Sequence, residues 1–266
     1  MSRRQVVQVA VGVGVGVGVG GFMIRPRAIA AQGTATPTTV EPVLGYVNLR
    51  VRQVADSEAR SRVNDLVTSD LVPDVQALPG YEGYILADVI DDDRQSLAVV
   101  VLEDAAQDED FTALARQFVA GLPSDLAVET PVMVAGDLLI TGASQSAAGT
   151  PAVGATPAAS PSAGSSYIAV RLHTSLPGTD PLDFVPLARD EFVPIVAALP
   201  GFQGYLWFPS EGGFTAVSLY DSEASARDST AAAADFVTRY LTEFTDGHPQ
   251  VINATGVFVD LPVLAR

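Results

Sequence analysis

Two nearly identical heptapeptides, LPGYEGY at residues 78–84 and LPGFQGY at residues 199–205, lie 121 positions apart and decide the fold. Around them, residues 70–84 and 191–205 are identical at nine of fifteen positions. Unrelated segments match at about one position in fifteen by ordinary residue frequencies. The chain therefore contains a tandem duplication of one domain.

An uncharged segment, residues 143–166, separates the two copies. It reads ASQSAAGTPAVGATPAASPSAGSS and has no aromatic residue, a composition typical of a flexible linker. A shorter stretch of similar composition, residues 32–44, precedes the first copy. We therefore expect one domain at residues 45–142 and a second at residues 167–266.

Each copy shows the same order of elements. In the first copy, alternating apolar residues predict a strand at 46–52. Helical spacing predicts a helix at 57–78 that Pro73 interrupts, because proline has no N–H to donate. The heptapeptide then ends this helix and starts the second strand. The other predicted elements of this copy are strands at 83–90, 96–104 and 128–140 and a helix at 108–121. The second copy repeats them, and the order βαββαβ is that of a ferredoxin-like unit.

A four-stranded sheet with helices on one face leaves the other face bare, and that face must be covered. Two copies in one chain can cover each other, and the linker of 24 residues keeps them at a high effective concentration. We predict an α+β fold in which two ferredoxin-like repeats pair within one chain as a barrel, and we expect a monomer.

Strand alternation separates two faces of each sheet. If Val47, Leu49 and Val51 face the helices, polar residues face the barrel interior, where a purely structural interface would place apolar ones. The residues predicted to face inward are Tyr46, Asn48, Arg50, Arg52, Tyr167, Ala169, Arg171 and His173. Trp207 and Tyr220, on neighbouring strands, are expected to line the same cavity.

The candidate site residues each allow two interpretations. His173, one of two histidines, is either a general base or haem-iron ligand, or a hydrogen-bonded histidine at a strand end. Arg50 and Arg171 occupy equivalent positions and either bind a carboxylate or enolate-like oxygen or form internal ion pairs. Further predicted substrate contacts are Tyr46, Tyr167 and Tyr220.

Composition excludes several kinds of chemistry. The chain has no lysine and no cysteine, so it has no Schiff-base lysine, no P-loop lysine, no disulfide and no cysteine-ligated metal. Its formal net charge of −16 argues against a nucleic-acid partner. The acidic runs at 91–93 and 108–110 lack the spacing of a calcium loop. We therefore predict no metal site.

Residues 1–31 have the layout of a secretory signal peptide. Arg3 and Arg4 precede an apolar stretch, and Ala28 and Ala30 form a cleavage signal. Ser2-Arg3-Arg4 followed by valine is similar to a twin-arginine export signal. We expect export to the cell envelope or medium, with no membrane span after cleavage. The alternative is an uncleaved N-terminal anchor.

The heptapeptide and the SLYDSEAS sequence at 218–225 together resemble the antibiotic-biosynthesis-monooxygenase-like domains of the dimeric α+β barrel superfamily. The resemblance covers both halves. It implies the paired ferredoxin-like fold stated above. The superfamily includes cofactor-free oxygenases, haem-degrading enzymes and members without a known reaction, so the resemblance alone does not select an activity.

Among these activities, our first functional hypothesis is a cofactor-free oxygenase acting on a small aromatic or polyketide-like substrate. His173, Trp207 and Asn48 are then the predicted catalytic residues, and the second half is the better candidate for an active half. Two alternatives remain: a non-catalytic small-molecule-binding or structural module, and a haem-binding or haem-degrading protein. Haem-degrading relatives use Asn, Trp and His together, but these three residues do not match that pattern within one domain.

Overall fold

The structure is a computed structural model that describes residues 42–143 and 166–265. The predicted signal peptide, residues 1–31, lies outside the described residues, as do residues 32–41 and 144–165 of the predicted linkers. No helix in the described part of the chain is long and apolar enough to cross a membrane.

The first half forms a βαββαβ unit whose last strand is divided. Its strands are β1 (Gly45–Gln53), β2 (Tyr81–Val89), β3 (Gln95–Leu102), β4 (Val132–Leu138) and β5 (Ile140–Ala143). Its helices are α1 (Ser57–Leu66), the π-helical η1 (Val67–Leu71), α2 (Val72–Gln76), the short η2 (Ala105–Gln107), α3 (Asp108–Gly121) and the short η3 (Ser124–Leu126). Pro73 lies in the first turn of α2, where its missing N–H costs nothing.

The second half repeats this order. Its strands are β6 (Tyr167–Thr174), β7 (Phe202–Ser210), β8 (Gly213–Tyr220) and β9 (Gln250–Asp260). Its helices are the short η4 (Pro181–Phe184), α4 (Val185–Leu187), the π-helical η5 (Ala188–Phe192), α5 (Val193–Ala197), α6 (Glu223–Phe236), the π-helical η6 (Val237–Leu241) and the short η7 (Pro262–Ala265). The duplication predicted from the sequence is therefore a duplication of structure.

The heptapeptide performs the same task in both halves. Gly80 and Gly201 adopt positive φ angles of 72° and 70°, a conformation that glycine reaches without strain. A Cβ atom at Gly80 would overlap the Gln107 side chain, and one at Gly201 would overlap Asp221. The predicted role, to end a helix and start a strand, is confirmed.

All nine strands belong to one antiparallel sheet with the order β4-β1-β3-β2-β9-β6-β8-β7-β5. The first four strands in this order come from the first half, and the next four repeat their arrangement with strands of the second half. This is the strand order of a ferredoxin-like unit, present twice, which confirms the predicted fold class. The limits of the two predicted domains, 45–142 and 167–266, stay predictions.

The last strand of each half crosses to the other half. β9 pairs with β6 along Gln250–Thr255 and with β2 along Ala254–Asp260. In the same way β4 pairs with β1, and the chain then bends at Leu139 so that β5 pairs with β7. The single strand predicted at 128–140 is therefore wrong, because the chain exchanges one neighbouring strand, β1, for another, β7, at Leu139. The two crossings nearly close the barrel.

The barrel interior is apolar and combines side chains of both halves. Val47 and Leu49 of β1 pack there with Ile168 and Val170 of β6. These residues were expected to face the helices, so the predicted orientation is reversed. The polar residues between them, such as Arg50 and Arg171, face the helices, where hydroxyl groups accept their hydrogen bonds.

The C-terminal segment closes one end of the barrel. Val263 of η7 is buried in the interior cluster, and Leu261 and Leu264 pack beside it. A Cβ at Gly83 would lie against Leu261, and one at Gly204 would overlap Leu264. The second glycine of each heptapeptide therefore makes room for this segment.

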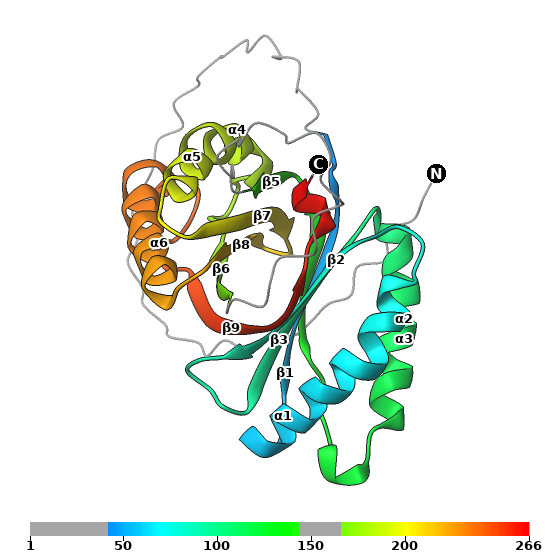
Figure 1. Cartoon of the computed structure of the whole chain (residues 1–266). Coiled ribbons are helices and arrows are strands. Elements are labelled where there is room, and N and C mark those ends of the chain that lie inside the picture. The colour runs from blue at the N-terminus through cyan, green and yellow to red at the C-terminus, as the bar shows by residue number, and fades with distance from the viewer. Residues whose placement is uncertain (1–41, 144–165, 266) are drawn as a thin grey trace, which may run out of the picture. The chain divides into compact units, whose positions relative to one another are not determined.

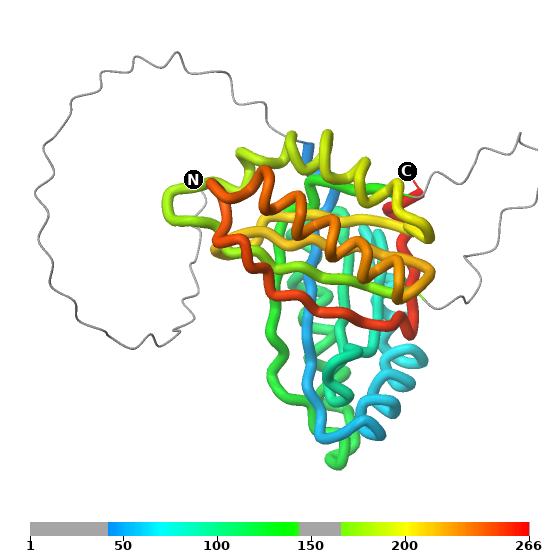
Figure 2. The backbone as a smooth tube through the Cα atoms, turned by 90° about the vertical axis from the view of Figure 1, so that its left-hand side faces the viewer, coloured from blue at the N-terminus to red at the C-terminus, as the bar shows by residue number. Residues whose placement is uncertain are grey.

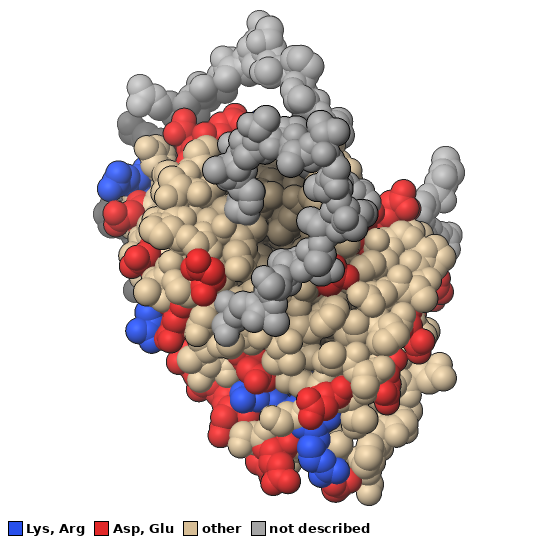
Figure 3. All heavy atoms as spheres, in the orientation of Figure 1, with Lys and Arg blue, Asp and Glu red and all other residues tan. Residues whose placement is uncertain are grey.

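The helices form two separate layers on the outside of the sheet. Figure 1 shows α1, α2 and α3 together on one side of the strands and α4, α5 and α6 on another. Figure 2 shows the same division from the side, with the helices of the second half above those of the first. The face in Figure 3 carries many more acidic than basic side chains, in keeping with the net charge of −16.

Candidate functional site

Three residues stand in register across the helix-facing side of the second half's sheet. Ala216 of β8 lies directly opposite Arg171 of β6 on one side and Trp207 of β7 on the other. Opposed residues in antiparallel strands have Cβ atoms about 5 Å apart and point to the same face. The small alanine therefore leaves space between a guanidinium group and an indole ring.

Two residues further along β6 and β8, the next pair on this face adds an imidazole and a phenyl ring. His173 lies opposite Phe214, and the two rings stack with centroids 4.4 Å apart and an angle of 13° between their planes. Phe214 also lies 5.6 Å from the ring of Trp207. His173, Phe214 and Trp207 thus form one continuous wall of a small cavity.

The other walls of this cavity come from the helices. Phe184, Ala188 and Phe192 line it from one side. On the other side, α6 and η6 contribute Ala233, Phe236, Val237 and Leu241. The space open to the centre of a water molecule is about 20 Å³, whereas one water requires about 10–15 Å³ measured in this way. The cavity has room for one or two atoms of ligand or water.

Both π-helical segments of the second half contribute to this lining, η5 through Ala188 and Phe192 and η6 through Val237 and Leu241. Single π-helical turns inside α-helices frequently occur at functional sites. The first half has the counterpart of η5, which is η1, but α3 ends at Gly121 without a π-helical turn. Of the two π-helical turns at the cavity, only η6 is thus specific to the second half among the described residues.

Arg171 is a buried cation that only neutral groups contact. Its side chain donates to the hydroxyl of Ser218 over 3.0 Å, of Ser229 over 2.7 Å and of Thr230 over 3.0 Å. Burial lowers the pKa of the guanidinium from its usual value. Arg171 forms no ion pair with any residue that the structure describes. The internal ion pair considered for Arg171 is therefore wrong.

Three buried nitrogen atoms at this cavity lack hydrogen-bond partners within residues 42–143 and 166–265. They are Nε of Arg171, Nδ1 of His173 and Nε1 of Trp207. A buried polar group without a partner costs about 1–3 kcal/mol. Because all three belong to lining residues of one cavity, an atom placed in the cavity is positioned to accept from them.

His173 is neutral at physiological pH. Burial, and then the charge of Arg171, lower the pKa of the imidazole from its ordinary value to about 4. Neutral imidazole retains an acceptor nitrogen and can take a proton from a bound ligand. His173 thus has the protonation state that a general base requires.

The equivalent place in the first half has different side chains. Ala98 lies between Arg50 and Leu86, so a leucine stands where the second half has Trp207. Arg50 donates to Asn48 over 3.1 Å and to Thr112 over 2.6 Å. The surrounding core consists mainly of aliphatic side chains.

The structure brings together only part of the predicted site. His173, Trp207 and Arg171 line one cavity, although it lies between sheet and helices and not inside the barrel. Tyr220 is buried in the same core cluster. The others lie elsewhere: Asn48, Arg50 and Tyr46 belong to the first half and Tyr167 lies at the seam between the halves.

Asn48 must therefore be removed from the catalytic set. It donates to the Asp108 carboxylate over 2.6 Å and accepts from Arg50, so its amide is engaged within the first half. The residues that the sequence did not single out are Ala216, Phe214, Ser229 and Thr230. The strand register places Ala216 beside Arg171 and Phe214 beside His173, and the packing of α6 brings Ser229 and Thr230 to Arg171.

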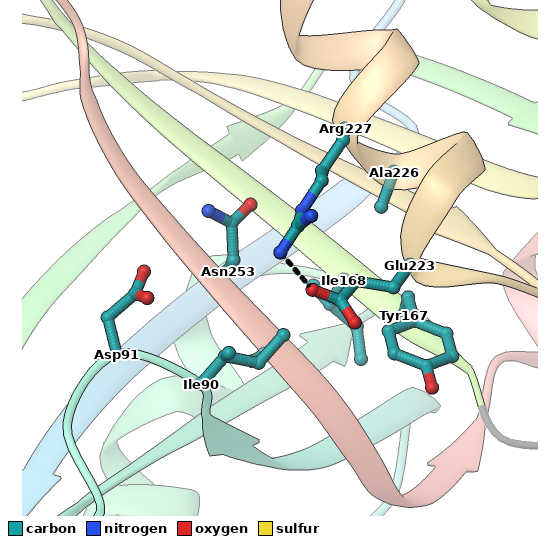
Figure 4. Close-up of a pocket in the computed structure, with 9 residues that line it drawn as sticks. Ile90, Asp91, Tyr167, Ile168, Glu223, Ala226, Arg227 and Asn253 are labelled. Carbon is teal, nitrogen blue, oxygen red and sulfur yellow. Dashed lines mark hydrogen bonds and ion pairs between the residues drawn. The ribbon is translucent and has the colours of Figure 1, made fainter.

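A second hollow of about 40 Å³ lies at the seam between the halves (Figure 4). Ile90 comes from the first half, and Tyr167, Glu223 and Arg227 come from the second. Arg227 and Glu223 form an ion pair with each other and are both exposed. Because its arginine is already paired with Glu223, this hollow is a weaker candidate than the cavity at Trp207.

Solved structures of several kinds of protein share this fold. A "putative monooxygenase" from Fusobacterium nucleatum is 12% identical, with a TM-score of 0.60 over 82% of this chain and 94% of that one. An anthrone oxidase-like protein is 15% identical, with a TM-score of 0.55 over 82% and 93%. A "putative chlorite dismutase" is 12% identical, with a TM-score of 0.51 over 83% and 97%.

No protein-family model and no curated protein matches the sequence. The solved structures, together with the sheet order, define the class of fold. The chain has the fold of the dimeric α+β barrel superfamily, in which the monooxygenase-like domains occur, and it carries that fold as a tandem repeat within one polypeptide.

Proposed function

We propose that the protein binds a small organic molecule in the cavity of its second half and oxygenates it without a bound cofactor. The observation that carries this proposal is the set of three partnerless nitrogens, on Arg171, His173 and Trp207, around one aromatic cavity. A purely structural core satisfies its buried polar groups. This site leaves donors available to a ligand.

The chemistry follows from the protonation states. Neutral His173 would take a proton from a carbon or oxygen acid, and Arg171 would stabilise the resulting anion. The electron-rich anion would then reduce molecular oxygen: one oxygen atom enters the reacting CH2 group, which becomes a carbonyl, and the other leaves as water with that group's two hydrogens. The likeness in fold to an anthrone oxidase-like protein makes aromatic ketones of that kind the first substrates to test.

The size of the cavity limits how such a substrate enters. About 20 Å³ accepts the reacting end of the molecule but not its rings, since ligand pockets usually measure about 300 Å³ or more. A ring must displace Phe192 or Phe236, whose centroids lie 4.9 Å apart. Binding is therefore expected to shift the π-helical segments that carry or adjoin them.

Haem does not fit this site. A porphyrin is far larger than the cavity, and the ring of His173 is stacked on Phe214. The haem-binding alternative therefore has no support in the arrangement of these residues. Within the described residues no cluster of His, Asp or Glu has the arrangement of a metal site.

The test compares equivalent substitutions in the two halves. Ala216→Leu fills the space between Arg171 and Trp207, and Ala98→Leu makes the same change in the first half. Oxygen uptake with anthrone, and the rise in Tm on adding it, are expected for the wild type and Ala98→Leu and to be lost in Ala216→Leu. Equal behaviour of the two variants would refute the proposed location.

We also propose that the protein is exported, from the signal-like layout of residues 1–31. Support comes from the sequence alone, because these residues lie outside the described part of the chain. A small-molecule oxygenase without metal, flavin or thiol would need no cofactor to be loaded before it leaves the cell.

A further inference from the structure

We propose that the cavity binds its ligand as an anion, through one negatively charged oxygen that accepts hydrogen bonds from Nε of Arg171 and Nε1 of Trp207. The ligand class is that of organic acids bound as their conjugate base: phenolates, enolates and carboxylates. This inference rests on the proposed small-molecule site and specifies what the site recognises.

The first argument is charge. The Arg171 side chain is 1% exposed, yet its partners are the neutral hydroxyls of Ser218, Ser229 and Thr230. An isolated buried charge is costly, and removal of its counter-ion from a buried pair destabilises strongly. The counter-charge is missing from the described residues, and a bound anion would supply it.

The second argument is the direction of the hydrogen bonds. Guanidinium and indole nitrogens only donate, so two of the three partnerless atoms require an acceptor. Neutral His173 can donate or accept at its remaining nitrogen. A ligand ammonium group would meet the charge of Arg171 and two donors, and is therefore excluded from this position.

The third argument is the number of free N–H groups. Both N–H groups of NH2 are engaged, by Ser229 and Thr230, and one N–H of NH1 is engaged by Ser218, which leaves the N–H of Nε and one N–H of NH1. Arginine usually holds a carboxylate through two parallel hydrogen bonds that pair NH2 with Nε or with NH1, so Arg171 cannot make this arrangement. With room for one or two atoms, the site is suited to a single terminal oxygen.

The first half provides an internal comparison at Arg50, the counterpart of Arg171, where these features are absent. Nε of Arg50 donates to Asn48, which in turn donates to the carboxylate of Asp108. Asp108 counters the effect of burial on the pKa of Arg50. Leu86 replaces the indole donor. We therefore expect no anion site at Arg50. Arg52 also has partnerless Nε and NH2 atoms, but it does not line the cavity at Trp207.

The experiment uses 4-nitrophenol, because its absorption spectrum distinguishes the phenol from the phenolate. Titration of the full-length protein is expected to lower the apparent pKa of the bound dye, since the site stabilises its anion. The neutral ether 4-nitroanisole, of similar shape, is expected to bind at least tenfold more weakly. Formate and formamide provide the same comparison between an anion and a neutral molecule with the smallest ligands. At equal ionic strength, formate is expected to raise the Tm more than formamide.

Two substitutions identify the donors. Trp207→Phe keeps an aromatic ring and removes the N–H, and is expected to weaken nitrophenolate binding about tenfold, the effect of one hydrogen bond to a charged group. Arg171→Gln is expected to abolish the shift in the dye's pKa. Arg50→Gln, at the equivalent place, is expected to leave binding unchanged. Circular dichroism identifies variants that fail to fold.

The outcomes separate this inference from the proposed function. If 4-nitroanisole binds as tightly as nitrophenolate and Ala216→Leu abolishes both, the site binds small molecules but does not select anions, and the inference is wrong. If Trp207→Phe folds and binds nitrophenolate as tightly as the wild type, the assignment of the indole donor is wrong. If the wild type binds none of the probes, the inference and the proposed function both fail.

Discussion

Arg50 and Arg171 occupy the same position in the two halves, each opposite an alanine on the neighbouring strand and each bonded through NH2 to a threonine on the last long helix. Their surroundings have nevertheless diverged. Arg50 stacks 4.4 Å over the ring of Phe111, whereas Arg171 donates to Ser229. The same arginine–threonine hydrogen bond thus lies beside a mainly aliphatic core in the first half and beside an aromatic cavity in the second.

This relationship predicts unequal costs for removing the hydroxyl partners. Ser229→Ala deprives fully buried Arg171 of an acceptor and is expected to lower the free energy of unfolding by about 1–3 kcal/mol. Thr112→Ala removes the acceptor of Arg50, but Thr112 is half-buried, so water can take its place and the loss is smaller. Urea denaturation of both variants measures the difference. A larger loss for Thr112→Ala would contradict this account of Arg171.

His173 makes stability depend on pH. Its pKa is about 4 in the folded protein and about 6.5 when unfolded, so the unfolded chain binds the extra proton between these values. Stability is therefore lost as pH falls through this window, by about 2 kcal/mol between pH 7.5 and pH 5 from this group alone.

His173→Gln is expected to reduce this loss, measured as the difference in free energy of unfolding at the two pH values. His248 lies in an exposed turn, so His248→Gln serves as the control and is expected to retain the full pH dependence. If the two variants show the same dependence, His173 is not the buried neutral histidine described above.

The heptapeptide predicts a difference between glycines with similar backbone angles. Gly201 and Gly178 both have positive φ, 70° and 86°, but a Cβ would overlap Asp221 at the first and meet no atom within 4 Å at the second. Gly178→Ala is expected to cost about 1 kcal/mol from backbone strain alone. Gly201→Ala is expected to cost clearly more, which thermal or urea denaturation can measure. Similar costs would mean that Gly201 is needed only for its positive φ angle and not to make room for Asp221.

Export is tested at the twin-arginine pair. Replacing Arg3 and Arg4 together by Lys keeps the charge and is expected to stop export through a twin-arginine route. The same change at Arg25 and Arg27 is the control and is expected to leave export intact. Cell fractionation reports both results, and unchanged export of the first variant would remove the twin-arginine assignment.

The sequence was sufficient for the fold because the decisive features are local and occur twice. The heptapeptides predict where each first helix ends and each second strand begins, and Gly80 and Gly201 do so with the expected angles. No local sequence signal predicts that β4 pairs with β1 of its own half while β5 pairs with β7 of the other half. The bend at Leu139 depends on pairing with β7, whose residues lie far away in the sequence.

The site was predicted less well because alternation defines two faces without saying which one is the interior. Arg171 and His173 were correctly placed on one face, but that face meets the helices. Arginine is accommodated there because Ser218, Ser229 and Thr230, 47 to 59 positions away, present hydroxyls. That complementarity appears only when the strand register is known.

The crossing of β9 and β5 between halves also has an evolutionary consequence. In a duplicated gene, a copy that loses its chemistry is normally free to decay or to be deleted. Here each copy completes the other's sheet, so each half must remain foldable even if only the other carries a function. Selection on one half therefore protects the other, and recombination that removes either copy would leave a protein with an open sheet edge.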